Sequence, residues 1–360
     1  MFQIFIEMGV KVSMKACVLH AVGDLRVEDV PIPEPKAGEV LVKVKAAGVC
    51  GSDIPRILHK GTYHFPCIPG HEFSGQIVKV GEGVDEKLIG RKTVVFPLIP
   101  CRKCPSCEAG KYAQCDNYDY IGSRRDGAFA EYVVAPEWNL VLAPDHLSYE
   151  ELAMCEPCGI AIHAINLANV ALGDNVAIYG AGPIGIMIAK WAQIKGAHKI
   201  MLIDVDQAKV DFAKEIGFEY VINSLKEDPI AWVKEQTGGR MADVCMEVAG
   251  VNATIENCLL STRKFGKIIG VGTPHSDVKI SMAAYEKLLR NQLEYIGTWN
   301  SEYAELPKNE WKVVVEAIAK GAMDVKPLVS HRVSLDDGIR PIQMMANHEE
   351  FFNKVLYVMD

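Results

Sequence analysis

The sequence Ile178-Tyr179-Gly180-Ala181-Gly182-Pro183-Ile184-Gly185 decides the fold of the second half of the chain. It places the pattern G-x-G-x-x-G directly after an apolar strand and at the start of a helix. Gly180 permits a tight turn, Gly182 lets backbone N–H groups approach a pyrophosphate, and Gly185 lets helix and strand pack closely. The helix N-terminus adds partial positive charge. This stretch therefore predicts a dinucleotide-binding βαβ unit.

Asp204 ends the next predicted strand, about 20 residues further on, where a carboxylate binds the adenosine ribose hydroxyls. A carboxylate at this position repels a 2′-phosphate, which favours NAD over NADP. The alternative is that Asp204 only caps the following helix. The candidate NAD-binding residues are Gly180, Gly182, Pro183, Ile184, Gly185 and Asp204.

Strands and helices alternate through the region that contains this motif. We expect strands at 176–179, 199–205, 220–222, 243–248, 267–271 and 294–298, and helices at 183–194, 207–216 and 229–236. Alternation of this kind predicts an α/β fold, with a doubly wound parallel sheet covered by helices on both faces. Residues 166–301 are assigned to this nucleotide-binding domain.

The first part of the chain has short strands punctuated by Gly and Pro, expected at 25–30, 39–47, 73–80 and 93–96. Two helical segments, 150–153 and 159–168, are expected to be separated by Pro157. The tail contains a helix at 311–320 and a strand at 355–358, which should pack on the first domain. Residues 1–165 and 302–360 thus form a mostly β domain, and residues 1–13 are interpreted as an extension before a start at Met14.

Composition limits the classes of function. The chain has 360 residues, 49% of them hydrophobic and 23% charged, with a net charge of −8, so we expect two soluble globular domains. An acidic chain is not attracted overall to nucleic acid or to an anionic membrane surface. No signal peptide or membrane-spanning run is recognisable. The 11 cysteines, an odd number, suggest a reducing compartment, and we expect the cytoplasm.

The loop CRKCPSCEAGKYAQC carries four cysteines at the spacing C-x2-C-x2-C-x7-C. Four thiolates at this spacing can converge on one tetrahedral Zn²⁺, which predicts a structural zinc site in residues 101–115. The alternatives are a disulfide loop or a redox-active pair, and neither a secretion signal nor a thioredoxin-like pattern supports them. The predicted ligands are Cys101, Cys104, Cys107 and Cys115.

A second set of metal-binding residue types occurs in Cys50-Gly51-Ser52-Asp53, in Pro69-Gly70-His71-Glu72, and at Glu156. A thiolate, an imidazole and a carboxylate suit a catalytic zinc ion that keeps one position open for substrate. Each residue alone has an ordinary structural explanation: a buried thiol, a turn serine at Ser52, or a helix cap at Glu156. Their occurrence beside a cysteine loop and a nucleotide motif favours the catalytic interpretation.

These segments, together with GHEFSG, GAFAEY and CEP, resemble the medium-chain zinc alcohol and polyol dehydrogenases, from about Met14 to the end of the chain. The resemblance implies a GroES-like catalytic domain with a Rossmann domain inserted into it, two zinc ions per chain, and NAD. It implies that Cys50, His71 and Glu156 bind the catalytic zinc and that Glu72 lies beside it as an exchanging ligand. Ser52 takes the position of the hydroxyl that relays the substrate proton.

The segments CGSDIPR and YIGSRRDG resemble those of galactitol-1-phosphate 5-dehydrogenases, which implies oxidation of galactitol 1-phosphate to tagatose 6-phosphate. Arg56, Arg124 and Arg125 are candidate phosphate-binding residues, because Arg binds phosphate through paired charge-assisted hydrogen bonds. Alternatively, these arginines are solvated, or paired with Asp126 and Glu131.

The sequence leaves other functions open. A free-polyol dehydrogenase acting on sorbitol or L-iditol is the main alternative, and a threonine dehydrogenase is a more distant one. A non-catalytic relative would be expected to lack a ligand or Ser52, and none is missing. Relatives pair their Rossmann sheets edge to edge, so residues 294–298 imply a homodimer or homotetramer.

Overall fold

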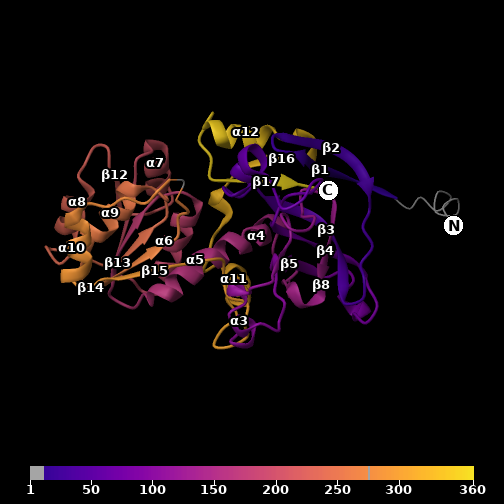
Figure 1. Ribbon diagram of the computed structural model, residues 1–360, viewed down its shortest axis with the longest axis horizontal. Coiled ribbons are helices and arrows are strands. Elements are labelled where there is room, and N and C mark those ends of the chain that lie inside the picture. Colours follow the sequence, from indigo (N-terminus) through magenta and orange to yellow (C-terminus); the bar gives the residue numbers. More distant parts are fainter. Residues whose placement is uncertain (1–11, 275) are drawn as a thin grey trace. The chain divides into compact units, whose positions relative to one another are not determined.

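The computed structural model describes residues 12–274 and 276–360, and these form two compact units (Figure 1). The first unit runs to Glu156 and resumes at Tyr303–Asp360, and the second is Pro157–Glu302. The division falls inside helix α5 (Cys155–Ala168), earlier than the boundary between 165 and 166 that the sequence suggested. The sequence also suggested that residues 1–13 are an extension before a start at Met14. Most of that segment, residues 1–11, lies outside the described residues.

The second unit is built on a six-stranded sheet in which every pair of neighbouring strands is parallel. The strand order is β12-β11-β10-β13-β14-β15, which is the doubly wound dinucleotide-binding order and confirms the predicted fold class. The strands are β10 (Asn175–Tyr179), β11 (Lys199–Asp204), β12 (Tyr220–Asn223), β13 (Ala242–Glu247), β14 (Thr262–Gly270) and β15 (Glu294–Gly297).

The helices of this unit include two that the sequence analysis missed, α9 (Asn252–Ser261) and α10 (Met282–Arg290). The others are α5, α6 (Pro183–Ile194), α7 (Gln207–Glu215) and α8 (Pro229–Gln236). Pro157 was expected to interrupt a helix, but it lies in the first turn of α5. A proline is tolerated there because the backbone N–H groups of the first turn have no partner within the helix.

The first unit contains a seven-stranded sheet in the order β16-β17-β3-β4-β5-β9, with β8 paired to β3. Its strands are β3 (Glu39–Gly48), β4 (Glu72–Val80), β5 (Lys92–Val95), β8 (Tyr132–Pro136), β9 (Leu140–Leu142), β16 (Val329–Val333) and β17 (Lys354–Val358). Two small antiparallel sheets join β1 (Ser13–Ala21) to β2 (Asp24–Pro31) and β6 (Leu98–Ile99) to β7 (Asp119–Tyr120).

The helices of the first unit are mostly short. They are α2 (Asp53–Pro55), η1 (Arg56–Lys60), η2 (Glu86–Leu88), α3 (Pro105–Glu108), η3 (Tyr112–Gln114), η4 (Glu137–Asn139), α4 (Tyr149–Ala153), α11 (Glu310–Ala319), η5 (Lys326–Leu328), η6 (Leu335–Asp337) and α12 (Arg340–Asn347). Within the described part of the chain, no helix combines the length and the apolar character needed to cross a membrane.

The C-terminal strand β17 pairs antiparallel with β3, which itself pairs antiparallel with β4. Gly48, at the end of β3, lies opposite both Leu356 of β17 and Glu72 of β4. The backbone N–H of Val49 continues this contact by donating to the carbonyl of Val355 at 2.9 Å. Three segments that are distant in sequence therefore meet where β3 ends, and the residues that follow β3 are held against them.

Candidate functional site

Cys50, His71 and Glu72 lie together beside the end of β3, with one potential ligand atom from each within 4.8 Å of the others. His71 immediately precedes β4, and Glu72 is its first residue. The absence of a side chain at Gly48 makes room for the Glu72 carboxylate, because a Cβ there would collide with it. A thiol, an imidazole and a carboxylate that converge in this way fit the donor set of a zinc site with an open position.

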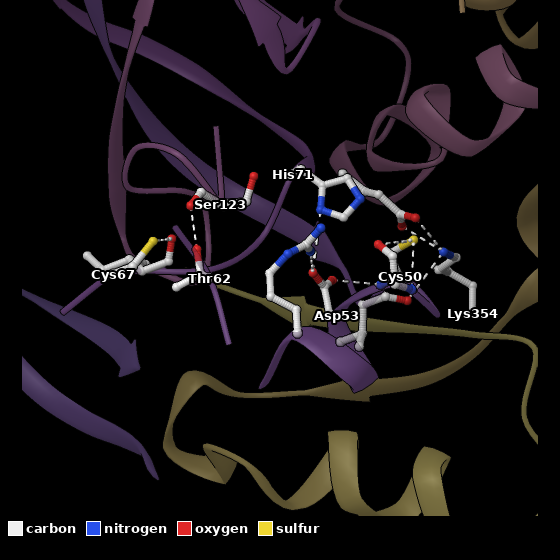
Figure 2. Close-up of polar contacts among 12 residues, drawn as sticks. Cys50, Asp53, Thr62, Cys67, His71, Ser123 and Lys354 are labelled. Atoms are coloured by element: carbon white, nitrogen blue, oxygen red, sulfur yellow. Dashed lines mark hydrogen bonds and ion pairs between the residues drawn. The ribbon is translucent and has the colours of Figure 1, made fainter. Parts of the chain in front are cut away.

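Asp53 lies next to this cluster, below the His71 ring in the view of Figure 2. Its carboxylate is fully buried, accepts a hydrogen bond from the Cys50 N–H at 3.0 Å, and lies 3.5 Å from Nδ1 of His71. Arg56 donates to it at 2.5 Å. Burial alone would raise the pKa of Asp53, but the attraction of His71 and Arg56 lowers that pKa to about 2.

The same attraction acts on the imidazole: burial favours a lower pKa for His71, yet Asp53 raises that pKa above its usual value. A carboxylate beside the second ring nitrogen orients a metal-binding histidine and fixes its tautomer. Asp53 belongs to the CGSD motif but was not among the site residues predicted from the sequence.

Lys354, the first residue of β17, forms a buried ion pair with Glu72 (Figure 2). Its ammonium group donates to the two Glu72 oxygens at 2.6 and 2.9 Å and contacts the Val49 carbonyl at 3.3 Å. Burial would lower the pKa of Lys354, but Glu72 raises it above the ordinary value. The two residues are 282 positions apart in sequence, and no local pattern indicated their contact.

Glu156, predicted as the third zinc ligand, lies in the first turn of α5 and is not part of the cluster. Glu72, predicted as an exchanging ligand, is the carboxylate that lies within the cluster. Burial raises the pKa of Glu156 to about 7, and the nearby charges of His71, Glu72 and Lys354 also act on it. The charges of the cluster therefore influence the pKa of Glu156, although its carboxylate is not one of the converging groups.

Ser52 precedes α2, and its hydroxyl makes no helix-capping hydrogen bond. Instead, Oγ donates to the Cys50 sulfur at 3.2 Å. This places an exposed hydroxyl beside the cluster, where an alcohol bound to a metal would be in reach. The ring of Tyr120, which the sequence analysis did not single out, lies 5.7 Å from the His71 ring and covers another side of the cluster.

The four cysteines of the loop 101–115 converge on a second point, with their sulfur atoms all within 4.8 Å of one another. Cys104 and Cys115 have sulfurs 3.9 Å apart, which is far too long for a disulfide and close to the edge of about 3.8 Å that a tetrahedron with Zn–S bonds of about 2.3 Å requires. Backbone N–H groups of Cys101 and Asn117 donate to the Cys115 sulfur. None of the 11 cysteines is part of a disulfide, so the disulfide alternative is not supported.

The glycine motif lies at the carboxyl end of β10, where it lines a cavity of about 440 Å³ in the second unit. Gly180 has a φ of +118°, a conformation that glycine adopts without strain. Gly182, Pro183 and Ile184 line the same cavity. Gly185 instead packs against the Gly180 carbonyl, which leaves no space for a side chain.

Asp204 also lines this cavity, and its carboxylate accepts hydrogen bonds from Ala181 N–H at 2.7 Å and Asp206 N–H at 2.9 Å. Asp206 caps α7, so the alternative role of Asp204 as the helix cap is wrong. The cavity lies beyond the carboxyl ends of β10 and β13, where the strand order reverses and nucleotides bind in such sheets.

The three arginines do not gather at one point. Arg56 is paired with Asp53, and Arg124 lies over the rings of Tyr63 and Tyr118, at 4.1 and 4.3 Å. Arg125 forms ion pairs with Glu39 at 3.1 Å and Asp119 at 3.9 Å.

Arg125 lines a separate cavity of about 430 Å³, which neither Ser52 nor Arg56 lines. The expectation that all three arginines converge on the active site is therefore corrected. Asp126 accepts a hydrogen bond from the Ile68 N–H, and Glu131 accepts one from the Lys15 N–H.

The comparisons with known proteins agree with this geometry. Residues 36–145 match the alcohol dehydrogenase GroES-like domain, and residues 183–320 match the zinc-binding dehydrogenase domain. The chain is 36% identical to galactitol 1-phosphate 5-dehydrogenase of Escherichia coli K12, over 93% of this chain and 97% of that protein. It is 33% identical to sorbitol dehydrogenase of Bacillus subtilis, over 96% and 97%.

Solved structures of dehydrogenases also resemble this protein over nearly its whole length. The crystal structure of galactitol-1-phosphate dehydrogenase from Escherichia coli matches with a TM-score of 0.90 at 36% identity, covering 96% of this chain and 100% of that one. A putative zinc-binding dehydrogenase from Sinorhizobium meliloti bound to NADP matches with a TM-score of 0.88 at 29% identity, covering 97% and 100%. With both domains and nearly the whole length matched, the chain belongs to the medium-chain, zinc-binding alcohol dehydrogenase family of oxidoreductases.

Proposed function

We propose that this protein is an NAD-dependent dehydrogenase that oxidises a secondary hydroxyl of galactitol 1-phosphate and produces tagatose 6-phosphate. The observation that carries the proposal is the position of the Ser52 hydroxyl, 3.2 Å from the sulfur of Cys50, within a cluster completed by His71 and Glu72. The 36% identity to galactitol 1-phosphate 5-dehydrogenase over most of both chains supports the choice of substrate.

Cys50 and His71 are the proposed permanent ligands of a catalytic zinc ion, with Glu72 or Glu156 as the third, exchanging ligand. The four cysteines of the loop 101–115 are the proposed ligands of a structural zinc ion. When bound, the catalytic zinc supplies Lewis-acid polarisation of the substrate hydroxyl, and NAD accepts the hydride.

The side chains around the cluster have separate tasks in this proposal. Ser52 accepts the proton of the substrate hydroxyl and passes it outward. Asp53 holds the His71 ring in one orientation, and Arg56 holds Asp53. Lys354 holds the Glu72 carboxylate in place through two hydrogen bonds, and both side chains are buried.

NAD is proposed to bind in the cavity at the carboxyl end of β10, with its pyrophosphate at the N-terminus of α6. Asp204 would accept hydrogen bonds from the adenosine ribose hydroxyls, and its charge would disfavour NADP. Relatives differ in this respect, since the Sinorhizobium meliloti structure contains NADP and a short chain alcohol dehydrogenase from Escherichia coli CFT073, 26% identical, is complexed with NADH.

A free polyol is the second candidate substrate, supported by the 33% identity to Bacillus subtilis sorbitol dehydrogenase over 96% of this chain. Oxidation of threonine is the third, since a threonine 3-dehydrogenase from Rhizobium etli is 32% identical over 87% of the chain. These relatives have similar identities, so the substrate must be decided by assay.

The deciding experiment measures NAD reduction by the purified protein with galactitol 1-phosphate, sorbitol, galactitol and threonine as separate substrates. We expect kcat/KM for galactitol 1-phosphate to exceed that for each other compound by at least about tenfold, the equivalent of one charge-assisted hydrogen bond to the ester. Equal efficiency with sorbitol would contradict the proposed substrate, and preference for NADP would contradict the role of Asp204.

We further propose a cytoplasmic enzyme that self-associates. The 11 cysteines, none of them in a disulfide, support a reducing compartment. Strand β15 pairs with β14 and with no other strand of the described residues, and its Tyr295 is 44% exposed. An edge strand with exposed aromatic area favours pairing with a second copy. Light scattering of the purified protein should give a dimer or tetramer mass.

A further inference from the structure

A cavity of about 340 Å³ opens beside Ser52 in the first unit. It is lined by Ser52, Pro55, Arg56, Lys60, Gly61, Thr62 and Tyr63. The lining comes from one continuous stretch, which begins at the hydroxyl next to Cys50 and runs through α2 and η1 into the following loop. A substrate whose hydroxyl reaches Ser52 therefore has this cavity available for another part of its length.

The charges in this cavity are unbalanced. Two cations line it, and no carboxylate does. Asp53 is the acid nearest in sequence, but it is buried behind the wall and already paired with Arg56. Lys60 is exposed and has no ion-pair or hydrogen-bond partner among the described residues. Since the chain carries a net charge of −8, this excess of positive charge is a local property of the cavity.

The loop that follows η1, which contains Thr62 and His64, is held by hydrogen bonds to neighbouring carbonyl groups. The Thr62 hydroxyl donates to the Ser123 carbonyl (Figure 2), and the His64 ring contacts the Arg124 carbonyl at 3.2 Å and the Pro66 carbonyl at 2.9 Å. These contacts hold the cavity wall in place before any ligand binds, which reduces the entropy cost of binding.

The Arg124 side chain adds a third cation at the edge of this cavity. Its guanidinium lies 4.1 Å from the centre of the Tyr63 ring and donates to the Tyr63 hydroxyl at 3.2 Å. Tyr63 itself lines the cavity. Arg125, by contrast, is paired with Glu39 and lines a different cavity, so it contributes nothing here.

We propose that this cavity binds the phosphate group of a polyol phosphate ester and that Lys60, a residue the sequence analysis did not identify, is the main determinant of specificity for the ester. The inference rests on the proposed function and names the residues that distinguish a phosphate ester from a free polyol. Arg56 has a smaller part, because Asp53 already neutralises its charge. The positive charge of Lys60, in contrast, has no ion-pair partner among the described residues.

The test compares Lys60→Ala and Lys60→Arg with the control Lys87→Ala, which removes an exposed lysine of η2 that lines none of the three cavities. We expect Lys60→Ala to raise KM for galactitol 1-phosphate by about 10- to 100-fold, since a hydrogen bond to a charged group contributes about 1.5–3 kcal/mol. KM for sorbitol should stay the same, and Lys60→Arg should retain most of the preference. Lys87→Ala should match the wild type.

The same assay separates failure of this inference from failure of the proposed function. If the wild type prefers galactitol 1-phosphate and Lys60→Ala keeps its KM, the phosphate binds elsewhere and the inference is wrong. If the wild type shows no preference, the proposed substrate is wrong, and inorganic phosphate then serves as the probe against sorbitol oxidation. Inhibition that depends on Lys60 would still support an anion site in this cavity, whereas equal or absent inhibition in both proteins would overturn it.

Discussion

The buried ion pair between Lys354 and Glu72 gives a prediction whose size follows from the structure. The ammonium lies 2.6 Å from a Glu72 oxygen, and both side chains are almost completely buried. Lys354→Met removes the cation and keeps similar volume, so a buried carboxylate is left without its partner. Removal of one member of a buried pair costs about 3–5 kcal/mol. The metal-free variant should lose about that much stability where β17, β3 and β4 meet.

The assay is native-state hydrogen exchange at the Val49 amide, which donates to the Val355 carbonyl next to Lys354. A loss of 3–5 kcal/mol lowers its protection factor by about two to four orders of magnitude. The double variant Lys354→Met with Glu72→Gln should recover part of the loss, because it no longer buries an unpaired charge. Bound zinc should also stabilise Lys354→Met more than the wild type, because the metal replaces the missing ammonium.

The exposed variant Lys87→Met is the control for the effect of a Lys-to-Met change and should leave Val49 protected as in the wild type. Protection that falls by less than about tenfold in Lys354→Met would refute the reasoning. A double variant no more stable than the single one would refute it as well, since the cost would then come from packing and not from charge.

Three further predictions follow from other residues. Ser52→Ala should lower kcat by about 10²- to 10⁴-fold while Ser52→Thr keeps measurable activity, as judged by steady-state kinetics, because only the hydroxyl can relay the proton. Asp204→Asn keeps an acceptor for the Ala181 N–H but removes the charge, so the ratio of kcat/KM for NAD to that for NADP should fall about 10- to 100-fold. Burial would raise the pKa of Asp243, but the Asn175 N–H and Arg263 lower that pKa below 3.8. The ionised Asp243 therefore stabilises the folded protein above pH 3.8, and this contribution is lost as the pH falls further. Asp243→Asn should therefore destabilise the β10 amides against hydrogen exchange at pH 7 by about 1.5–3 kcal/mol, the contribution of hydrogen bonds to a charged group, and the deficit relative to the wild type should shrink below about pH 4.

The sequence predicted features that depend on residues close together in the chain. The glycines from Gly180 to Gly185 and Asp204 are diagnostic because a strand, a turn and a helix follow one another locally. The cysteines of the loop 101–115 are diagnostic because their spacing alone lets the sulfurs converge. Both patterns led to the correct fold class and family.

Features that depend on tertiary contacts were not predictable in this way. The Lys354–Glu72 pair joins positions 282 apart, and it forms only because β17 returns to pair with β3. Arg125 follows Arg124 in sequence, yet its side chain pairs with Glu39, 86 positions away. Lys60 belongs to no recognisable motif, and its proposed role can be inferred only when the cavity and its charges are known.

The most direct test of the account is the position of bound zinc, measured by anomalous X-ray diffraction at the zinc absorption edge from crystals of the zinc-loaded protein. We predict two anomalous peaks per chain, one bonded to Cys50 and His71 and one at the centre of the four-cysteine loop. A map with no peak between Cys50 and His71, in crystals where the cysteine loop does hold zinc, would contradict the proposed oxidation at this site.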